Sequence, residues 1–234
     1  MWQFAAHTEG GEYTNYVNSD YLIFDDRSPF HREVSRRLIK EARKYFKDYT
    51  SWWDDKPDMS GSWDTWHGNH MELICFTSNV VSVAQYPGSF PTHGGADPCI
   101  PVNFINEGGH ARQFTVSELF VPKSGWEKKL SDLCIGEITS QDKEFVVDGT
   151  NTVFEPEQLT QFTVTPKTLQ IHILNSYIGI LGGESIIYGG ESVVDIPWSE
   201  LRAYLRPDGP ARFLTKLTNG NEPALPFRNG RQTP

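Results

Sequence analysis

Two histidines and a carboxylate fall within residues 66–72 of the chain: His67, His70 and Glu72. These side chains bind metal ions when they converge on one point. A helix would bring His67 and His70 to the same side, whereas a strand would place His70 and Glu72 on one face. The spacing differs from that of the zincin motif. We therefore expect polar contacts in a loop here, and we keep His67, His70 and Glu72 as weak candidates for metal ligands.

A second group of reactive residue types lies in a segment rich in glycine and proline. It consists of His93, Asp97 and Cys99. A cysteine beside a histidine can act as a nucleophile with its base. The sequence shows no third member to orient the base and no oxyanion hole. The alternative interpretation is a tight loop in which Gly94 and Gly95 supply positive φ angles.

A third group is aromatic and acidic. Four tryptophans are interleaved with aspartates between residues 52 and 66: Trp52, Trp53, Asp54, Asp55, Asp58, Trp63, Asp64 and Trp66. The tryptophans can cap the core from outside, or they can form an exposed platform for sugar rings or for a protein hot spot. Acidic residues beside such a platform suit a cationic protein partner.

Charge and composition exclude some classes of function. The chain has 234 residues with 21 Lys+Arg against 30 Asp+Glu, a net charge of −9. Nucleic acid is therefore not expected as a partner, because phosphate binding needs a basic face. No window approaches the ~20 apolar residues of a membrane helix. The N-terminus shows no signal peptide, so the protein is either cytosolic or a mature chain whose leader was removed.

The elements that must position these groups follow from the hydrophobic spacing. Residues 32–49 repeat apolar side chains at the spacing of one helical face, with Ser28 as N-cap and Pro29 at the first helical position. The Trp-rich residues 51–69 have neither helical nor strand period and predict a long loop or ragged hairpin. Further patterns predict strands at 13–24, around a turn at Asn79 within 71–86, in a hairpin at 162–174 and at 193–197, with a second helix at 125–134. This order predicts an α+β fold with an antiparallel β-sheet packed against one long and one or two short helices.

The three cysteines, Cys75, Cys99 and Cys134, leave two alternatives open. An odd count is poor evidence for a disulfide framework. One alternative is a Cys75–Cys99 bridge with one free thiol. The other is three reduced, buried thiols.

Four segments in order resemble one known family. Residues 86–98 (YPGSFPTHGGADP) are similar to its aromatic segment and Gly-Gly-Ala-His loop, although Asp97 stands where the family usually has His, and His93 where it often has Thr. Residues 102–106 and 114–120 resemble its N-F … L-x-L-x-D-L-F pattern. Residues 162–169 resemble its hairpin, and 193–201 its closing V-x-I-P-Y-S-E-L. The chain thus resembles the RsiV-like domain family, DUF3298, preceded by a deacetylase-associated half similar to DUF4163.

This resemblance implies an extracytoplasmic α+β domain over residues 1–206. Its N-terminal half covers about 12–86 and its C-terminal half about 87–206, and 207–234 form a loosely ordered tail. Anti-sigma factors that resemble the family use the domain as an ectodomain that binds lysozyme, and in deacetylases it accompanies a separate catalytic domain. The family has no established catalytic residues to carry over.

The sequence therefore favours a non-catalytic, periplasmic or extracellular binding domain without a cofactor. Its ligand would be a cationic cell-wall-active protein such as lysozyme, or cell-wall glycan. The expected binding residues are Trp52, Trp53, Asp54, Asp55, Trp63, Trp66, His93 and Asp97. Two alternatives are a hydrolase that acts on cell-wall material through a His/Asp/Cys or metal site, and a structural domain.

Overall fold

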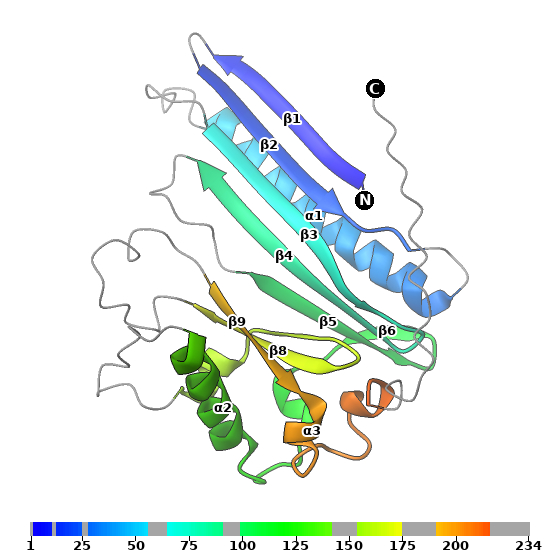
Figure 1. Cartoon of the computed structure of the whole chain (residues 1–234). Helices are drawn as coiled ribbons and strands as arrows, with labels where there is room; N and C mark the ends of the chain where they lie inside the picture. The colour runs from blue at the N-terminus through cyan, green and yellow to red at the C-terminus, as the bar shows by residue number, and fades with distance from the viewer. Residues whose placement is uncertain are drawn as a thin grey trace.

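The computed structural model of the protein describes residues 2–10, 13–24, 28–55, 65–90, 99–141, 154–174 and 191–215. These residues form two β-sheets with helices on either side (Figure 1). The six strands of the larger sheet lie in chain order: β1 (Trp2–Gly10), β2 (Tyr13–Tyr21), β3 (Thr65–Phe76), β4 (Val80–Phe90), β5 (Ile100–Glu107) and β6 (His110–Gln113). The smaller sheet contains β7 (Phe162–Val164), β8 (Thr168–Leu174) and β9 (Glu191–Pro197). The predicted α+β class is confirmed.

The helical elements connect and cover these sheets. The α-helices are α1 (Pro29–Asp55), α2 (Trp126–Gln141) and α3 (Trp198–Leu201). Short 3-10 turns are η2 (Val116–Leu119), η3 (Pro156–Leu159) and η6 (Pro210–Phe213). All strand pairs in the two sheets are antiparallel except β2–β3. That pair is parallel because α1 carries the chain back between its two strands.

Helix α1 begins where its sequence predicts, at Pro29, and the carbonyl of Ser28 accepts the first hydrogen bond from Arg32 at 3.1 Å. The helix ends later than predicted, at Asp55. The prediction of a loop over 51–69 is therefore wrong at both ends, because β3 already starts at Thr65. Tertiary contacts override local preference here: the Tyr49 ring lies 4.5 Å from that of His67, and the first residues of β3 pair with both β2 and β4.

The larger sheet carries a different core on each face. On one face, α1 buries Phe30, Val34, Leu38 and Ala42 against Met71, Val81, Val83 and Phe104. On the other face, Val80 and Ile105 pack with α2 and with the smaller sheet, through Leu130, Leu169, Ile171 and Ile173. Val80 and Val81 belong to different cores because successive side chains of a strand point to opposite faces.

A β-bulge in β3 changes which side chains face α1. Leu73 pairs with Val83 and Cys75 with Ser82, so Ile74 is the extra residue. Leu73 and Phe76 both pack on the α1 core, although three positions separate them, whereas Cys75 belongs to the second core. The irregular hydrophobic pattern of residues 71–76 thus has a structural cause.

Both ends of the described chain are more ordered than the sequence predicts. Strand β1 pairs along its length with β2, although its residues give no strand signal. Beyond Arg206, where a loose tail was expected to begin, Ala211 and Leu214 of the η6 region are buried in the second core. Packed structure therefore continues to residue 214, and residues 216–234 lie outside the description.

The Cys75–Cys99 bridge is not formed, and all three cysteines are reduced and buried. Cys75 lies opposite Ser82, which lies opposite Asn103, and Cys99 comes four residues before Asn103. Four residues of strand span about 13 Å. A disulfide tolerates a Cα separation of only about 7 Å, so the strand register keeps the two thiols apart.

Candidate functional site

A groove opens between α1 and the larger sheet. Helix α1 packs on β1, β2, β3 and β6, and beside its second half the end of β4 and the start of β5 remain uncovered. The groove has a volume of about 770 Å³. Its lining residues include Glu41, Lys44, Tyr45, Asp48 and Tyr49 of α1, Asn69 of β3, Gln85 and Pro87 of β4, and Ile100 of β5. We call it the amide groove.

Two side-chain amides give the groove its name. Asn69 pairs with Pro87, and Gln85 pairs with Met71, so the two amides are diagonal neighbours on the α1 face, typically about 7–8 Å apart. They are almost completely buried, with 3% and 8% of their surfaces exposed. Asn69 donates from Nδ2 to Ser19 Oγ at 3.3 Å, which leaves its Oδ1 for the groove.

The Gln85 side chain has no hydrogen-bond partner among the residues that the structure describes, yet it lines the groove. Burying an amide without a partner costs about 1–3 kcal/mol. An amide without a protein partner avoids this free-energy cost when water or a polar ligand can form hydrogen bonds with it. Gln85 therefore offers both a donor and an acceptor to whatever enters the groove.

The helical wall of the groove is aromatic. The centroids of the Tyr45 and Tyr49 rings lie 4.5 Å apart, and the centroid of the His67 ring is also 4.5 Å from that of Tyr49. The Tyr45 hydroxyl donates to the carbonyl oxygen of Gly68 at 2.8 Å, which fixes the ring against β3. These contacts hold the tyrosines in position before any ligand arrives.

Charged side chains lie at the rim. Glu41 and Asp48 contribute two carboxylates and Lys44 one ammonium, all exposed. Aromatic rings, planar amides and carboxylates are the groups that bind a polyhydroxylated molecule: rings cover its apolar faces, and the polar groups bond its hydroxyls. The volume lies within the ~300–1,000 Å³ range of ligand pockets.

No family model matches this sequence, and no curated protein matches it. Solved structures do. The crystal structure of a DUF3298 family member from Bacteroides fragilis NCTC 9343 covers 92% of this chain and 97% of its own, with a TM-score of 0.53 and 11% identity. That of a DUF3298 family protein from Pseudomonas aeruginosa PAO1 covers 88% and 94%, with a TM-score of 0.55 and 12% identity.

The chain has the DUF3298 fold. The resemblance inferred from the four sequence segments is thus confirmed at the level of fold. Identities of 11% and 12% carry no residue roles, so the site on this DUF3298 fold is argued from its own side chains.

The predicted Trp-rich site is divided between elements of the DUF3298 fold. Trp52, Trp53, Asp54 and Asp55 lie on the last turns of α1, one to two turns beyond Tyr49. Trp66 lies in β3, in register with Tyr16 of β2. Trp63, His93 and Asp97 lie outside the described residues. The helical part of the predicted site therefore follows, along α1, the residues that line the amide groove.

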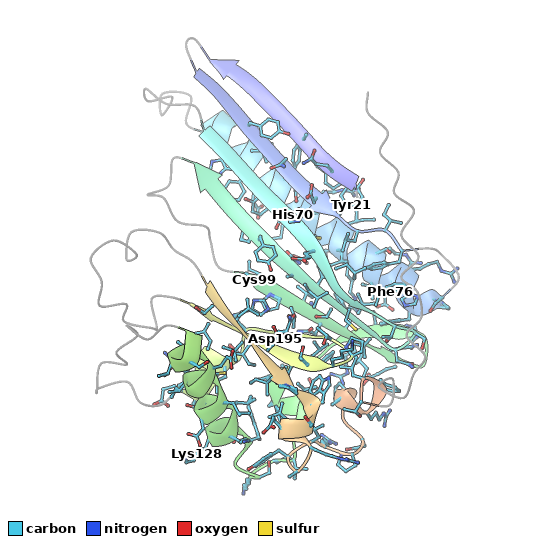
Figure 2. The ribbon with its side chains drawn as sticks, in the orientation of Figure 1. Tyr21, His70, Phe76, Cys99, Lys128 and Asp195 are labelled. Carbon is cyan, nitrogen blue, oxygen red and sulfur yellow. The ribbon has the colours of Figure 1, made fainter. Side chains whose placement is uncertain are left out.

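The weak metal candidates do not converge. His67 lies on the α1 side of β3, whereas His70 and Glu72 share the opposite face, as a strand requires. His70 pairs instead with Asp20 of β2, at 2.8 Å between Nδ1 and Oδ2, and its side chain is 57% exposed (Figure 2). Within the described ranges, no three His, Cys, Asp or Glu side chains come close enough to hold a metal ion.

The candidate thiol of a hydrolase is enclosed. Cys99 is buried just before β5 (Figure 2). Its proposed partners His93 and Asp97 fall outside the described residues. Burial also raises the pKa of Cys75 and of Cys134 to about 12, so neither thiol ionises near neutral pH.

Sequence reasoning missed the residues that line the groove. Tyr45 belongs to the apolar stripe of residues 32–49, which predicts core packing, and Tyr49 one turn later extends the same helix face without indicating a groove. Asn69 and Gln85 lie sixteen positions apart, and only the β3–β4 register brings them together. Among the described residues, no helix is both long and apolar enough to cross a membrane.

Proposed function

We propose that this protein is a non-catalytic binding domain that holds a cell-wall glycan in the amide groove. The observation that carries the proposal is Gln85, which is only 8% exposed, lines the groove and has no side-chain hydrogen-bond partner among the described residues. A polar, uncharged ligand rich in hydroxyl or acetamido groups satisfies such an amide. The neighbouring rings of Tyr45 and Tyr49, tilted by 40° to each other, supply the apolar surface that a sugar ring covers.

The carboxylates of the groove support binding rather than hydrolysis. Glu41 and Asp48 are seven positions apart on α1, which corresponds to about 10.5 Å along the helix axis. Retaining glycosidases place their two carboxyl groups about 5–5.5 Å apart, and inverting enzymes about 6.5–9.5 Å. This axial separation is larger than either range, so the pair fits binding better than hydrolysis.

A cationic cell-wall-active protein such as lysozyme is the second candidate ligand. The net charge of −9 favours it, and Asp48, Asp54 and Asp55 gather acidity near the C-terminal end of α1. Both ligands act outside the cytoplasm, so the proposal places the domain in the periplasm or outside the cell.

Calorimetric titration with chitotetraose and with soluble peptidoglycan fragments tests the glycan proposal. We expect the exchange Gln85→Met, which keeps the side-chain length but removes the amide, to weaken binding at least about tenfold, or about 1.4 kcal/mol. The matched control is Gln3→Met, on the sheet face opposite α1. Equal affinity of Gln85→Met and wild type, or no binding by the wild type, would overturn the proposal. Salt-sensitive binding of lysozyme without glycan binding would select the second ligand.

A further inference from the structure

We propose that a second cleft, on the smaller-sheet side of the molecule, binds a ligand with several phosphate groups. It is independent of the amide groove and of the function proposed there. The cleft has a volume of about 850 Å³, and its basic lining residues are Lys167, Arg202, Arg206 and Arg212. We call it the arginine cleft.

Three separate segments bring these cations together. Lys167 lies in the turn between β7 and β8, Arg202 directly follows α3, and Arg212 lies in η6. Backbone contacts fix the segments: Trp198 N donates to Lys167 O at 3.2 Å, and Arg206 N donates to Leu119 O at 2.8 Å. The cleft is therefore formed in advance by packed structure rather than by one flexible loop.

The side chains of Trp198 and η6 strengthen this framework. The Trp198 indole nitrogen donates to Thr165 O at 3.0 Å, which anchors α3 to the β7–β8 turn. Ala211 and Leu214 are buried in the second core, which anchors η6. The cationic groups thus project from a rigid support.

The three arginines of the cleft differ in the charged side chains that they already contact. Arg206 is held by Asp208, with distances of 2.7 and 3.0 Å to its two carboxylate oxygens, and this contact raises the pKa of Arg206. Arg202 and Arg212 are exposed and make no direct ion pair with a described residue, although the Asp208 carboxylate also attracts Arg212 electrostatically. The Arg212 guanidinium lies 4.5 Å from the centre of the Phe213 ring, which orients it.

The charge of the cleft is opposite to that of the whole chain. The protein carries −9 overall, yet no carboxylate is among the described residues that line the cleft. A guanidinium presents paired donors that match phosphate oxygens, and the three arginines of the cleft carry more positive charge than the neighbouring Asp208 carboxylate can balance. Several cations around one cleft suit a ligand with more than one phosphate, because one monovalent anion would neutralise only one of them.

Titration with sodium tripolyphosphate at low salt tests this proposal. We expect the double variant Arg202→Gln/Arg212→Gln to bind at least about tenfold more weakly than the wild type. The matched control, Arg36→Gln/Lys40→Gln, removes two charges from the exposed face of α1 and should bind like the wild type. Equal loss in both variants, or no loss in the cleft variant, would overturn the proposal, since general electrostatics would then explain binding.

Chemical modification of the wild type tests the same proposal even if the Arg202→Gln/Arg212→Gln variant does not fold. Phenylglyoxal modifies accessible arginines, and mass spectrometry locates the products. Tripolyphosphate should protect Arg202 and Arg212 and leave Arg36 reactive; equal protection of all three would contradict the proposal. A glycerol phosphate oligomer, used in parallel, distinguishes a phosphodiester polymer from free phosphate species. Citrate binding as tight as that of tripolyphosphate would overturn the assignment to phosphate.

Discussion

The hydroxyl of Ser82 donates a 2.6 Å hydrogen bond to Asn103 Oδ1, and this buried pair joins the two sheets. Ser82 also accepts a bond from Val164 N at 3.1 Å, and Asn103 Nδ2 donates to Phe162 O at 2.7 Å. Two strands of the larger sheet thus hold the β7 backbone through side chains. No other polar contact described above links the sheets so directly.

Removing one member of this pair should destabilise the protein. We expect Asn103→Ala to lower the free energy of unfolding by about 1–3 kcal/mol, because Ser82 and Phe162 O lose their partner in a buried site. Urea denaturation measures the change. In a double-mutant cycle with Ser82→Ala, additive effects would contradict the coupling.

The hydrogen bond of Tyr45 should matter for ligand binding more than for folding. Tyr45→Phe removes the bond to Gly68 O but keeps the ring. We expect about 1 kcal/mol of lost stability and a several-fold weaker affinity for chitotetraose, because the aromatic wall is less firmly held. Tyr204→Phe, on the turn after α3, is the control. An unchanged affinity of Tyr45→Phe would show that the ring needs no such support.

The buried thiols should resist modification while the protein is folded. Cys75 and Cys134, with pKa values near 12, should fail to react with Ellman's reagent at pH 8 until urea unfolds the chain. Mass spectrometry of the labelled protein identifies the sites. Rapid labelling of either thiol in native buffer would contradict the described burial.

The same thiols predict a loss of stability at alkaline pH. The unfolded thiols ionise near pH 9, whereas the folded ones stay protonated until about pH 12. The unfolded state therefore binds fewer protons in this window, and stability should fall with rising pH by up to roughly 1.4 kcal/mol per pH unit for each thiol. Unfolding curves of Cys75→Ala/Cys134→Ala should show a shallower decline between pH 9 and 11; an identical slope would exclude the thiols as its cause.

Glu33 should stabilise the contact between α1 and β6 at neutral pH only. Its carboxylate accepts from Ala111 N at 3.0 Å and pairs with Arg37 at 2.7 Å, and the bond from Ala111 is the main cause of its lowered pKa. A lowered folded pKa gives stability that is present above the unfolded value of about 4.5 and is lost as pH falls through the folded value. Glu33→Gln should thus destabilise the protein at pH 7 by less than about 1 kcal/mol, because solvent screens the pair. At pH 3, variant and wild type should unfold alike.

Sequence patterns predicted the elements whose periodicity is strong. The amphipathic stripe of Val34, Leu38 and Ala42 marked α1, and the hairpin at 162–174 corresponds to β7 and β8. Strand β1 was missed because its residues show no clear alternation, and it forms through pairing with β2. The parallel β2–β3 pair likewise depends on a crossover that no local pattern encodes.

The candidate site was only partly predictable for a related reason. Trp52 and Asp54 indicated an aromatic and acidic region, and both follow the groove-lining Tyr49 on the same helix. No sequence pattern marks Gln85 as a binding residue, because its place in the groove depends on the neighbours that the fold brings to it. Likewise, the cations of the arginine cleft are dispersed from residue 167 to residue 212 and meet only through tertiary packing.

The bulge at Ile74 divides β3 into two stretches of opposite phase. Before it, odd-numbered residues such as Leu73 face α1; after it, the even-numbered Phe76 does. Deleting Ile74 would restore regular alternation and leave both stretches on their present faces, whereas one residue inserted or deleted elsewhere in β3 would turn one stretch to the opposite face. The length of β3 on either side of the bulge is consequently as constrained as its composition, and length changes should be tolerated at the bulge and in the connecting loops.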